Sequence, residues 1–342
     1  MKRLKRFLAN LPIKRRLIDT FFSFINLPLV GMVYQRLYYR MISKKAPQAL
    51  SKMDIETYNV CNLRCIMCPY PAMKREKVLM SLDLFKKIID DAARSGIREI
   101  GLNFYNEPLI DRLLFERIRY AKAKGLKVCF SSNGTLLTDE MIDSLLDSGL
   151  DLITFSFDGA TREVYEQIRV GADFEKTRNN ILSLIEKRNN RGLKKPIISV
   201  YLVAQKGNYR ETGEFRASWQ GLADRVSIGE VDSRKTDDLL PDALRSKTRS
   251  RRIYPCRRLF EVVTVMSNGQ VALCCFDFDG SVILGDLNRQ TIREVWNSAE
   301  SKKIRQAHLD GNGDKIKLCR EVNCSLIYRS GAYEWWGRFD YM

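Results

Sequence analysis

Residues 53–70, MDIETYNVCNLRCIMCPY, join a β-rich run to three cysteines and a proline. Met53–Tyr58 has the composition of a short strand. Cys61, Cys65 and Cys68 follow it within eight positions, so the predicted strand ends at a loop of thiols. Thiolate sulfur is a ligand for zinc and for iron–sulfur centres. The stretch therefore predicts a metal-binding or redox-active loop at the carboxyl end of the first strand.

Strand-like and helical segments alternate after residue 51. Helical spacing recurs over Leu82–Arg94, after Ser81 and before Gly96, and over Asp139–Leu146 after Thr138. The further strand-like runs are Glu99–Phe104, Lys127–Ser131, Leu152–Phe157, Ile197–Ala204 and Arg225–Glu230. Six βα units predict an α/β fold with a parallel sheet, either a barrel or an open doubly wound sheet. Polar segments follow the first four strands, where a parallel barrel assembles its active site.

The composition indicates a globular chain with anionic partners. Its formal charge is +17, which suits nucleic acid, a membrane surface, an acidic redox protein or a phosphorylated substrate. No interleaved aromatic and basic motif supports RNA binding, so nucleic acid is disfavoured. Nine cysteines without a signal-peptide pattern favour reduced, metal-binding thiols in a cytoplasmic chain over disulfides.

Residues 1–50 form a basic and apolar extension. Thr20–Gln35 carries no charge, but Pro28 and Gly31 interrupt it. The run is shorter than the roughly 20 residues that a membrane span needs. Two interpretations stay open: the extension packs against the main domain or a partner, or it lies as interfacial helices on an anionic membrane.

The three thiols of the first loop do not complete a structural zinc site, which takes four tetrahedral ligands. No histidine or further cysteine lies nearby in the sequence. A [4Fe–4S] cluster on three cysteines would instead keep one iron open to a ligand. An open metal position is a catalytic feature, as it is for zinc.

The spacing C-x3-C-x2-C at the end of the first strand of a predicted βα barrel resembles that of the radical S-adenosylmethionine (SAM) enzymes. The resemblance covers roughly residues 51–325. It implies a partial (β/α)6 TIM-like barrel in which the open iron of a three-cysteine [4Fe–4S] cluster chelates SAM. It also implies reductive cleavage of SAM to a 5′-deoxyadenosyl radical that abstracts a hydrogen atom from the substrate.

The same resemblance implies further site residues. Tyr105–Pro108 is similar to the Gly-Gly-Glu-Pro segment that binds the SAM amino group, with Asn106 in place of the second glycine. The implied SAM-binding residues are Met67, Asn106, Glu107, Pro108, Ser132, Asn133, Ser156 and Arg169. An arginine suits a carboxylate. The alternatives are a helix-capping acid for Glu107 and a solvated helix charge for Arg169.

The last third of the chain predicts a second module. Residues 261–275, EVVTVMSNGQVALCC, place two β-rich halves around Asn268–Gly269, a hairpin signal. This part resembles the SPASM/twitch extensions, which implies one auxiliary [4Fe–4S] cluster on four thiolates. Its implied ligands are Cys256, Cys274, Cys319 and Cys324, with Cys275 as an alternative to Cys274. A structural zinc ion on these thiols is the other interpretation. His308 receives no role.

The predicted organisation has four parts: the extension (1–50), the radical SAM barrel (51–240), the SPASM/twitch module (250–330) and an aromatic tail (331–342). FYNEPL, GDL and the single-cluster spacing resemble the butirosin-pathway dehydrogenase type. This implies oxidation of a hydroxyl on a carbohydrate- or cyclitol-like substrate, with the auxiliary cluster as electron acceptor. Asp277 in CCFDFDG is the candidate proton acceptor, unless it serves the turn.

Two alternative functions stay open. One is a maturase that modifies ribosomal peptides, although residues 1–50 lack a winged-helix pattern. The other is an electron-transfer or binding protein without radical chemistry, against which Glu107, Ser156 and Arg169 argue. The expected electron donor is an acidic flavodoxin or ferredoxin, which would dock on a basic surface. The expected substrate is a small molecule or an anionic glycan precursor.

Overall fold

The computed structural model describes residues 37, 50–230, 256 and 258–321. Several predicted features lie outside these residues. They are almost all of the 1–50 extension, Cys324 and the aromatic tail 331–342.

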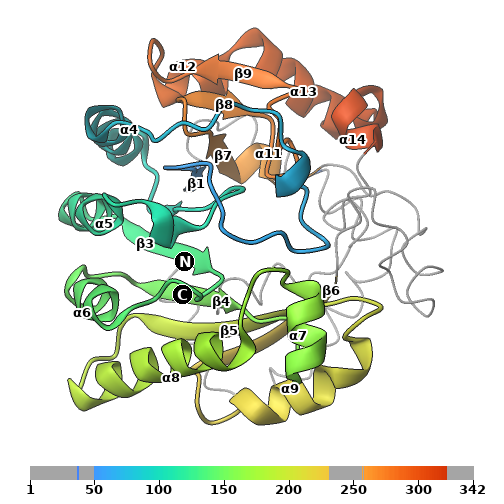
Figure 1. Ribbon diagram of the computed structural model, residues 1–342. Coiled ribbons are helices and arrows are strands. Elements are labelled where there is room, and N and C mark those ends of the chain that lie inside the picture. The colour runs from blue at the N-terminus through green and yellow to red at the C-terminus, as the bar shows by residue number, and fades with distance from the viewer. Residues whose placement is uncertain (1–36, 38–49, 231–255, 257, 322–342) are drawn as a thin grey trace, which may run out of the picture.

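One nine-stranded sheet organises the part of the chain that the structure describes (Figure 1). Its order is β6-β5-β4-β3-β2-β1-β7-β8-β9. The strands are β1 (Lys52–Ile55), β2 (Glu99–Gly101), β3 (Lys127–Ser132), β4 (Leu152–Ser156), β5 (Ile197–Ala204), β6 (Arg225–Glu230), β7 (Val262–Val265), β8 (Gln270–Ala272) and β9 (Ile283–Asp286). Strands β1 to β6 are parallel, β7 is parallel to β1, and β8 and β9 are antiparallel. The predicted α/β fold is confirmed, and the six consecutive parallel strands are compatible with a partial barrel.

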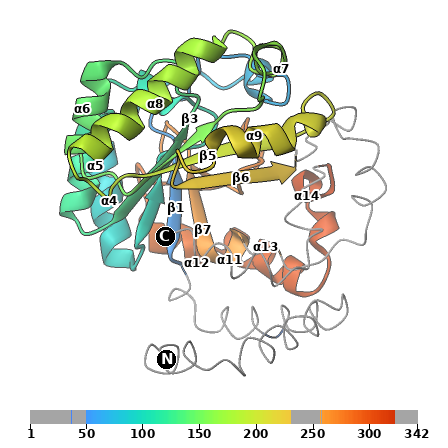
Figure 2. The ribbon, with the colours of Figure 1, turned by 90° about the horizontal axis from the view of Figure 1, so that it is seen from below.

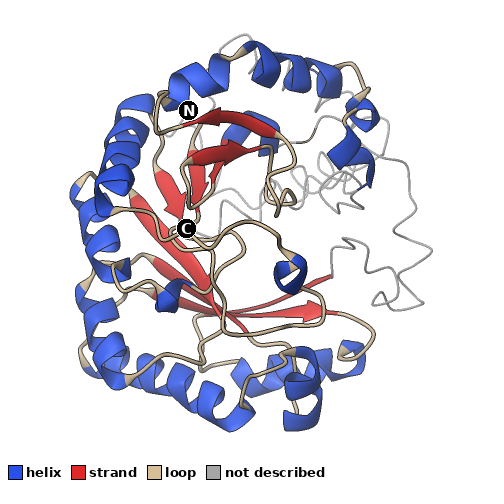
Figure 3. Ribbon diagram, turned by 45° about the horizontal axis from the view of Figure 1, so that its top comes forward, coloured by secondary structure: helices blue, strands red, loops and turns tan. Residues whose placement is uncertain are grey.

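Helices α4, α5, α6 and α8 line the outer face of the curved sheet (Figures 2 and 3). The α-helices are α4 (Leu82–Ser95), α5 (Leu114–Ala123), α6 (Asp139–Asp147), α7 (Arg162–Ile168), α8 (Phe174–Asn190), α9 (Thr212–Trp219), α11 (Arg258–Glu261), α12 (Ile292–Asn297), α13 (Ala299–Leu309) and α14 (Lys317–Glu321). Short 3-10 helices are η1 (Tyr70–Ala72), η2 (Pro108–Ile110), η3 (Tyr209–Glu211) and η5 (Gly313–Lys315). None of the described helices is both long enough and apolar enough to traverse a bilayer.

Local signals set the helix ends as predicted. The Ser81 hydroxyl accepts a hydrogen bond from the backbone N–H of Leu84, and the Thr138 hydroxyl caps α6 in the same way. Gly96 ends α4 in the left-handed region at φ 88°, which a residue without a side chain adopts at little cost. The caps therefore confirm both predicted helices, and each runs one residue further than the sequence indicated.

Strands β1 and β2 stop three residues earlier than predicted, and polar side chains follow each of them. Strand β1 ends at Ile55, and the Glu56 side chain turns to an arginine. Strand β2 ends at Gly101, and the Asn103 side chain then bonds both backbone groups of Ser131, at 2.6 and 2.8 Å. The carboxyl ends of β1 and β2 are thus polar loops. These loops carry the candidate site.

The predicted hairpin is confirmed and extends the main sheet. Strands β7 and β8 pair antiparallel around Gly269, whose φ is +87°. Because β7 also pairs with β1, in the register Lys52↔Val262, the core continues without a break into the C-terminal module. A smaller apolar cluster lies under that module and is made of Cys256, Leu259, Phe260, Leu273, Ile304, Leu309 and Cys319.

Candidate active site

The loop after β1 places three thiols close together. The pKa of the Cys61 thiol is raised to about 12, mainly by burial and to a smaller extent by the Glu107 carboxylate and the thiols of Cys65 and Cys68. The loop is fixed by backbone hydrogen bonds from Arg64 and Ile66 to the carbonyls of Val170 and Ile168, at 3.0 and 3.1 Å. A buried thiol of this kind becomes a thiolate readily only when a cation lies beside it or a metal centre binds its sulfur.

Glu107 is the centre of a buried hydrogen-bond network at the ends of β2 and β3. Its carboxylate accepts from the Ser132 hydroxyl at 2.7 Å, from the Asn133 backbone N–H at 2.7 Å and from the Leu109 N–H at 3.1 Å. The last contact caps η2, in which Pro108 is the first residue. Burial raises the pKa of Glu107, and these hydrogen bonds oppose that shift. The capping alternative therefore describes one part of what Glu107 does.

Asn133 links this network to the thiol loop. Its side-chain amide donates to the Asn62 side-chain oxygen at 2.9 Å and lies 4.0 Å from the Cys61 sulfur. Its own oxygen accepts from the Thr135 N–H and hydroxyl, at 3.0 and 2.7 Å. The predicted Ser132–Asn133 segment is thus brought against the first cysteine.

Arg169 reaches the thiol loop from the end of α7. Its Nε donates to the Asp158 carboxylate at 2.6 Å, and its Nη1 donates to the Cys65 sulfur at 3.5 Å. The other Asp158 oxygen accepts from the Val203 N–H at 2.7 Å. The alternative of a solvated helix charge is wrong, because both members of the ion pair are buried.

Two polar atoms at the strand ends have no hydrogen-bond partner among the described residues. They are Nδ2 of Asn106 and Oε1 of Gln205, and both are buried. The Gln205 amide nitrogen lies 3.9 Å from the Met67 sulfur, so Met67 and β5 meet at this edge. Ser156 is the last residue of β4 and is half-buried. Each of these two atoms is available to a polar ligand or to a water molecule.

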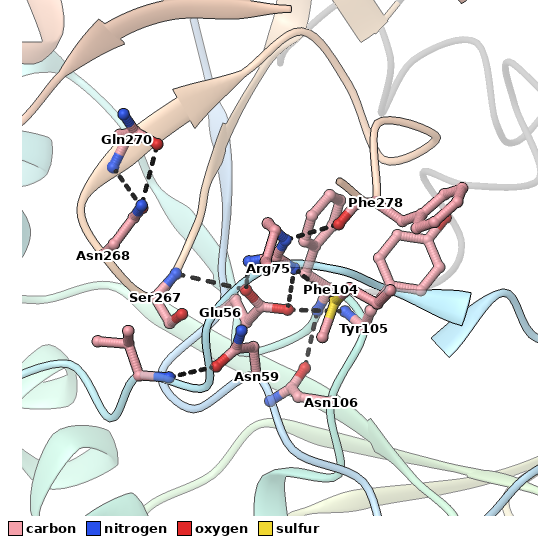
Figure 4. Close-up of polar contacts among 12 residues, drawn as sticks. Glu56, Asn59, Arg75, Phe104, Tyr105, Asn106, Ser267, Asn268, Gln270 and Phe278 are labelled. Carbon is pink, nitrogen blue, oxygen red and sulfur yellow. Dashed lines mark hydrogen bonds and ion pairs between the residues drawn. The ribbon is translucent and has the colours of Figure 1, made fainter. Parts of the chain in front are cut away.

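A second hub joins the thiol loop to the C-terminal module (Figure 4). The buried Glu56 carboxylate forms a bidentate pair with Arg75, at 2.7 and 3.0 Å, and accepts from the Tyr105 N–H at 3.2 Å. Arg75 Nε donates to the Phe278 carbonyl at 2.6 Å, and the Ser267 N–H donates to Glu56 at 3.4 Å. Burial raises the pKa of Glu56, and Arg75 lowers it.

The second set of thiols gathers in the C-terminal module. Burial raises the pKa of Cys274 well above its ordinary value, and the adjacent thiols of Cys275, Cys256 and Cys319 add to the shift. Cys274 is thus within electrostatic reach of Cys256 and Cys319, and Cys275 is within electrostatic reach of Cys256, so both stay candidates for the same ligand position. Cys324, the fourth implied ligand, lies outside the described residues.

Arg258 supplies a half-buried cation beside this second set. Burial opposes its charge, but the Cys275 thiol and the Asp54 carboxylate raise its pKa. The guanidinium forms an ion pair with Asp54 on β1. Arg258 therefore places a positive charge beside the C-terminal thiols, and its ion pair with Asp54 connects it to β1.

Asp277 has its carboxylate engaged within its own loop. It accepts from the Ser281 N–H and hydroxyl at 2.6 and 2.7 Å, and from the Val282 N–H at 2.8 Å. These contacts match the turn role that the sequence left open. A role for Asp277 in proton transfer stays a prediction.

Sequence reasoning missed Glu56, Arg75, Gln205, Arg258 and His308. Only two of them had a signal that could have found them. Glu56 is an acid inside a predicted buried strand, and His308 is the one histidine of a chain with nine cysteines. The others have partners far away in the sequence. Arg75 and Phe278, for example, are 203 residues apart.

Family models match both parts of the chain. Residues 55–211 match the radical SAM superfamily, and residues 256–325 match an iron–sulfur cluster-binding domain, SPASM. The chain belongs to the radical SAM superfamily and carries a C-terminal SPASM domain. It is accordingly an enzyme whose cofactors are SAM, a SAM-binding [4Fe–4S] cluster and an auxiliary cluster. The chain spans 51% and 59% of the length of two of the curated relatives that it matches.

Particular relatives differ in how much of the chain they match. The 2-deoxy-scyllo-inosamine dehydrogenase of Niallia circulans is 24% identical over 83% of this chain and 97% of its own. A cofactor-modifying protein for tungsten-containing aldehyde ferredoxin oxidoreductase in Pyrococcus furiosus is 33% identical over 55% of this chain, and the match spans 51% of its length. The solved structure of BtrN with AdoMet and 2-DOIA has a TM-score of 0.56 and 18% identity over 82% of this chain and 96% of its own. The structural likeness shows the fold.

The residues present fit the implied cofactors. The first thiol set lies beside the buried Arg169 and the second beside the half-buried Arg258, and the strand ends hold unpartnered polar atoms. Within the described ranges, no three Cys, His, Asp or Glu side chains converge closely enough to hold a single metal ion. The donor chemistry is that of thiolate-ligated iron.

Proposed function

We propose that this enzyme oxidises a hydroxyl of a carbohydrate- or cyclitol-like substrate to a carbonyl. The contact that supports this most directly joins the loop after β2 to the second thiol set. The Tyr105 hydroxyl, in the segment expected to bind SAM, donates to the carbonyl of Cys275 at 2.8 Å. A substrate held at this junction would face both a hydrogen-atom acceptor and an electron acceptor. The dehydrogenase from Niallia circulans, which aligns over most of both chains, supports the same chemistry.

The residue roles are part of this proposal. Cys61, Cys65 and Cys68 hold the first cluster. Cys256, Cys274, Cys319 and Cys324 hold the second, with Cys275 as the alternative to Cys274. When bound, these groups and SAM supply an adenosyl radical that takes hydrogen from a carbinol carbon and an acceptor for the second electron, while the hydroxyl proton leaves to a base.

The protein's own residues prepare the SAM-binding end. Glu107 fixes the backbone of Asn133 and the hydroxyl of Ser132, and Asn133 approaches the Cys61 sulfur. We assign the unpartnered Nδ2 of Asn106 and Oε1 of Gln205 to polar groups of the bound nucleoside. Arg169 holds the Cys65 sulfur from one side, and its remaining guanidinium donors would meet a carboxylate.

Anaerobic reconstitution tests the first-cluster assignment. Reduced protein with SAM and 2-deoxy-scyllo-inosamine is expected to release 5′-deoxyadenosine. Cys65→Ala removes a proposed ligand and is expected to abolish the release. Cys129→Ala is the matched control, because Cys129 lies on β3 with its sulfur 3.5 Å from the Ile100 carbonyl. Equal release by wild type and Cys65→Ala would refute the assignment.

Isotope transfer tests the oxidation itself. With deuterium on the carbinol carbon, the label is expected in 5′-deoxyadenosine, and the substrate is expected to become a ketone in equal amount. A set of aminocyclitols and sugars is tested in this way. If every one of them gave 5′-deoxyadenosine without a ketone, the proposed substrate class would be contradicted. A modified precursor peptide would instead support the maturase alternative.

The electron donor that we propose is a flavodoxin or ferredoxin. An acidic donor would dock on a chain with a formal charge of +17 through long-range attraction. Raising the salt concentration from about 0.05 to 0.5 M shortens the Debye length several-fold and is expected to slow reduction sharply. Reduction that is insensitive to salt would count against this donor surface.

We also propose that residues 1–50 give this enzyme, as a cytoplasmic protein, a peripheral contact with anionic membranes. Interleaved basic and apolar residues in this extension support the proposal. Wild type is expected to sediment with phosphatidylserine-containing vesicles, and a chain without residues 1–49 is expected to stay in solution. Equal sedimentation of the two would contradict it.

A further inference from the structure

His308 lies between two cysteines of the C-terminal thiol set. It is the only histidine of the chain, projects from α13 and is fully buried. The backbone N–H of Cys256 donates to its Nδ1 at 3.2 Å. Its Nε2 lies 3.6 Å from the sulfur of Cys319. One imidazole ring therefore spans two proposed ligands that are 63 residues apart in the sequence, at positions 256 and 319.

The contact with Cys256 fixes which nitrogen of the ring carries the proton. A ring nitrogen that accepts a hydrogen bond holds a lone pair, and a neutral imidazole has one donor and one acceptor nitrogen. Since Nδ1 accepts from a backbone N–H, which has no acceptor capacity of its own, the proton belongs on Nε2. The Nε2–H group then donates to the Cys319 sulfur. A thiolate sulfur accepts such a bond better than a thiol does.

The surroundings make this hydrogen bond effective. Both cysteines belong to the smaller core cluster, together with Phe260, Leu273 and Leu309, and the ring is fully buried. Water is scarce in such a setting, so a polar contact is electrostatically stronger than at the surface. Hydrogen bonds to the sulfurs and exclusion of solvent are two of the factors that set the reduction potential of an iron–sulfur cluster.

We propose that His308 is a positioning residue that raises the reduction potential of the auxiliary cluster through an Nε2–H hydrogen bond to Cys319. Reduction adds negative charge to the cluster and its sulfurs, and a donor aimed at one sulfur stabilises the reduced state more than the oxidised state. The inference rests on the proposed ligand role of Cys319. It assigns to the chain's own histidine the tuning of the electron acceptor that alcohol oxidation needs.

Three substitutions separate the two contacts of the ring. His308→Gln keeps an amide donor near the Nε2 position, His308→Asn keeps only an acceptor near the Nδ1 position, and His308→Leu keeps neither. Each is made in the full-length chain that carries Cys61→Ala, Cys65→Ala and Cys68→Ala, so that the auxiliary cluster is the one paramagnetic centre. The readout is its midpoint potential in an EPR-monitored redox titration.

At the midpoint potential of the parent, the ratio of reduced to oxidised cluster in the Asn and Leu variants is expected to be about tenfold lower than in the parent. This corresponds to a midpoint potential lower by about 59 mV for one electron. The Gln variant is expected to stay close to the parent. If His308 only filled space, the midpoint potentials of the three variants would follow how well each new side chain packs. They would not follow whether that side chain carries a hydrogen-bond donor near the Nε2 position. Unchanged potentials in the Asn and Leu variants, or a Gln variant as low as the Asn variant, would overturn the proposal.

A second measurement needs no substitution at His308. Protein labelled with ¹⁵N-histidine and purified through a histidine-free tag carries the label at one residue. Pulsed EPR of the reduced auxiliary cluster is expected to show a weak ¹⁵N coupling and an exchangeable proton. A coupling as strong as that of a direct ligand, or no coupling, would overturn the proposal.

Iron and sulfide analysis shows beforehand whether the auxiliary cluster is present. Absence of this cluster would refute the ligand set and, with it, this inference. Failure of the enzyme to oxidise an alcohol would refute the proposed function but leave the measurement of the midpoint potential valid.

Discussion

The guanidinium of Arg169 bridges the carboxylate of Asp158 and the sulfur of Cys65. Its Nε lies 2.6 Å from the carboxylate oxygen, and its Nη1 lies 3.5 Å from the sulfur. Because Asp158 also accepts from the Val203 N–H on β5, one cation ties the thiol loop after β1 to the ends of β4 and β5. The arrangement compensates the buried carboxylate of Asp158 and places a positive charge beside the Cys65 sulfur, where it opposes the rise that burial causes in the pKa of that thiol.

Arg169→Gln is expected to lower the free energy of unfolding of the metal-free protein by about 3–5 kcal/mol, because it leaves a buried carboxylate unpaired. Urea unfolding followed by circular dichroism measures the change. The double variant Asp158→Asn/Arg169→Gln removes both charges and is expected to recover part of the loss. If the double variant were as unstable as the sum of the two single variants, the ion pair would not be the cause.

The contact of Arg75 with Phe278 predicts local loosening of the C-terminal module when Arg75 is replaced. Arg75→Met removes the hydrogen bond to the Phe278 carbonyl and the partner of Glu56. Amide hydrogen exchange of residues 276–282 is expected to rise by about tenfold, the equivalent of about 1.4 kcal/mol.

Lys87→Met is the matched control for Arg75→Met. The Lys87 ammonium donates to the carbonyls of Leu287 and Asn288, elsewhere in the same module, at 3.0 and 2.7 Å. It is expected to affect exchange around residue 288 and not around residue 278. Equal acceleration of both segments by both variants would mean that the module opens as one unit.

Much of the fold could be predicted because its signals are local. Ser81 and Thr138 cap helices through side-chain oxygens next to the helix start, and Gly269 takes a left-handed turn conformation between two β-rich runs. The convergence of polar strand ends then follows from parallel topology, since the carboxyl ends of parallel strands meet at one edge. The three cysteines were placed in this way, whereas the role of Glu107 was implied by the resemblance to the radical SAM enzymes.

The polar partners inside the site could not be predicted from the sequence. Glu56 and Arg75 are 19 residues apart, and His308 meets Cys256 across 52 residues. Such pairs form only when helices, strands and loops that are far apart in the sequence pack together. The local spacing of residues in the sequence does not predict that packing. Arg169 shows the same limit, because its sequence position on a helix suited solvent as well as it suited the buried Asp158.

Gly159 shows a close approach of backbone that a side chain would prevent. A β-carbon there would lie 2.6 Å from the backbone nitrogen and 2.8 Å from the α-carbon of Tyr165. Gly159→Ala is expected to destabilise the protein by about 1–3 kcal/mol, the usual cost of overpacking. Gly213 in α9 has open space around the same position, so Gly213→Ala is expected to be neutral or to stabilise by up to about 1 kcal/mol. Thermal unfolding compares the two variants, and equal losses would contradict the steric argument.

Asp151 makes a pH-dependent contribution to stability. Although burial opposes its charge, hydrogen bonds from Lys122 at 2.5 Å and Lys195 at 2.6 Å hold the pKa of its carboxyl below the ordinary value of 3.8. A carboxylate with a lowered native pKa stabilises the fold above its unfolded pKa, and this contribution is lost as the pH falls through the native value. The difference in unfolding free energy between wild type and Asp151→Asn is therefore expected to be largest near neutral pH and to shrink below about pH 4.

Urea titrations at pH 3, 5 and 7 measure this difference. Asp147→Asn is an exposed control that is expected to change the unfolding free energy by less than about 0.5 kcal/mol. A difference between wild type and Asp151→Asn that did not vary across this range would show that the carboxylate's charge is not what stabilises the fold.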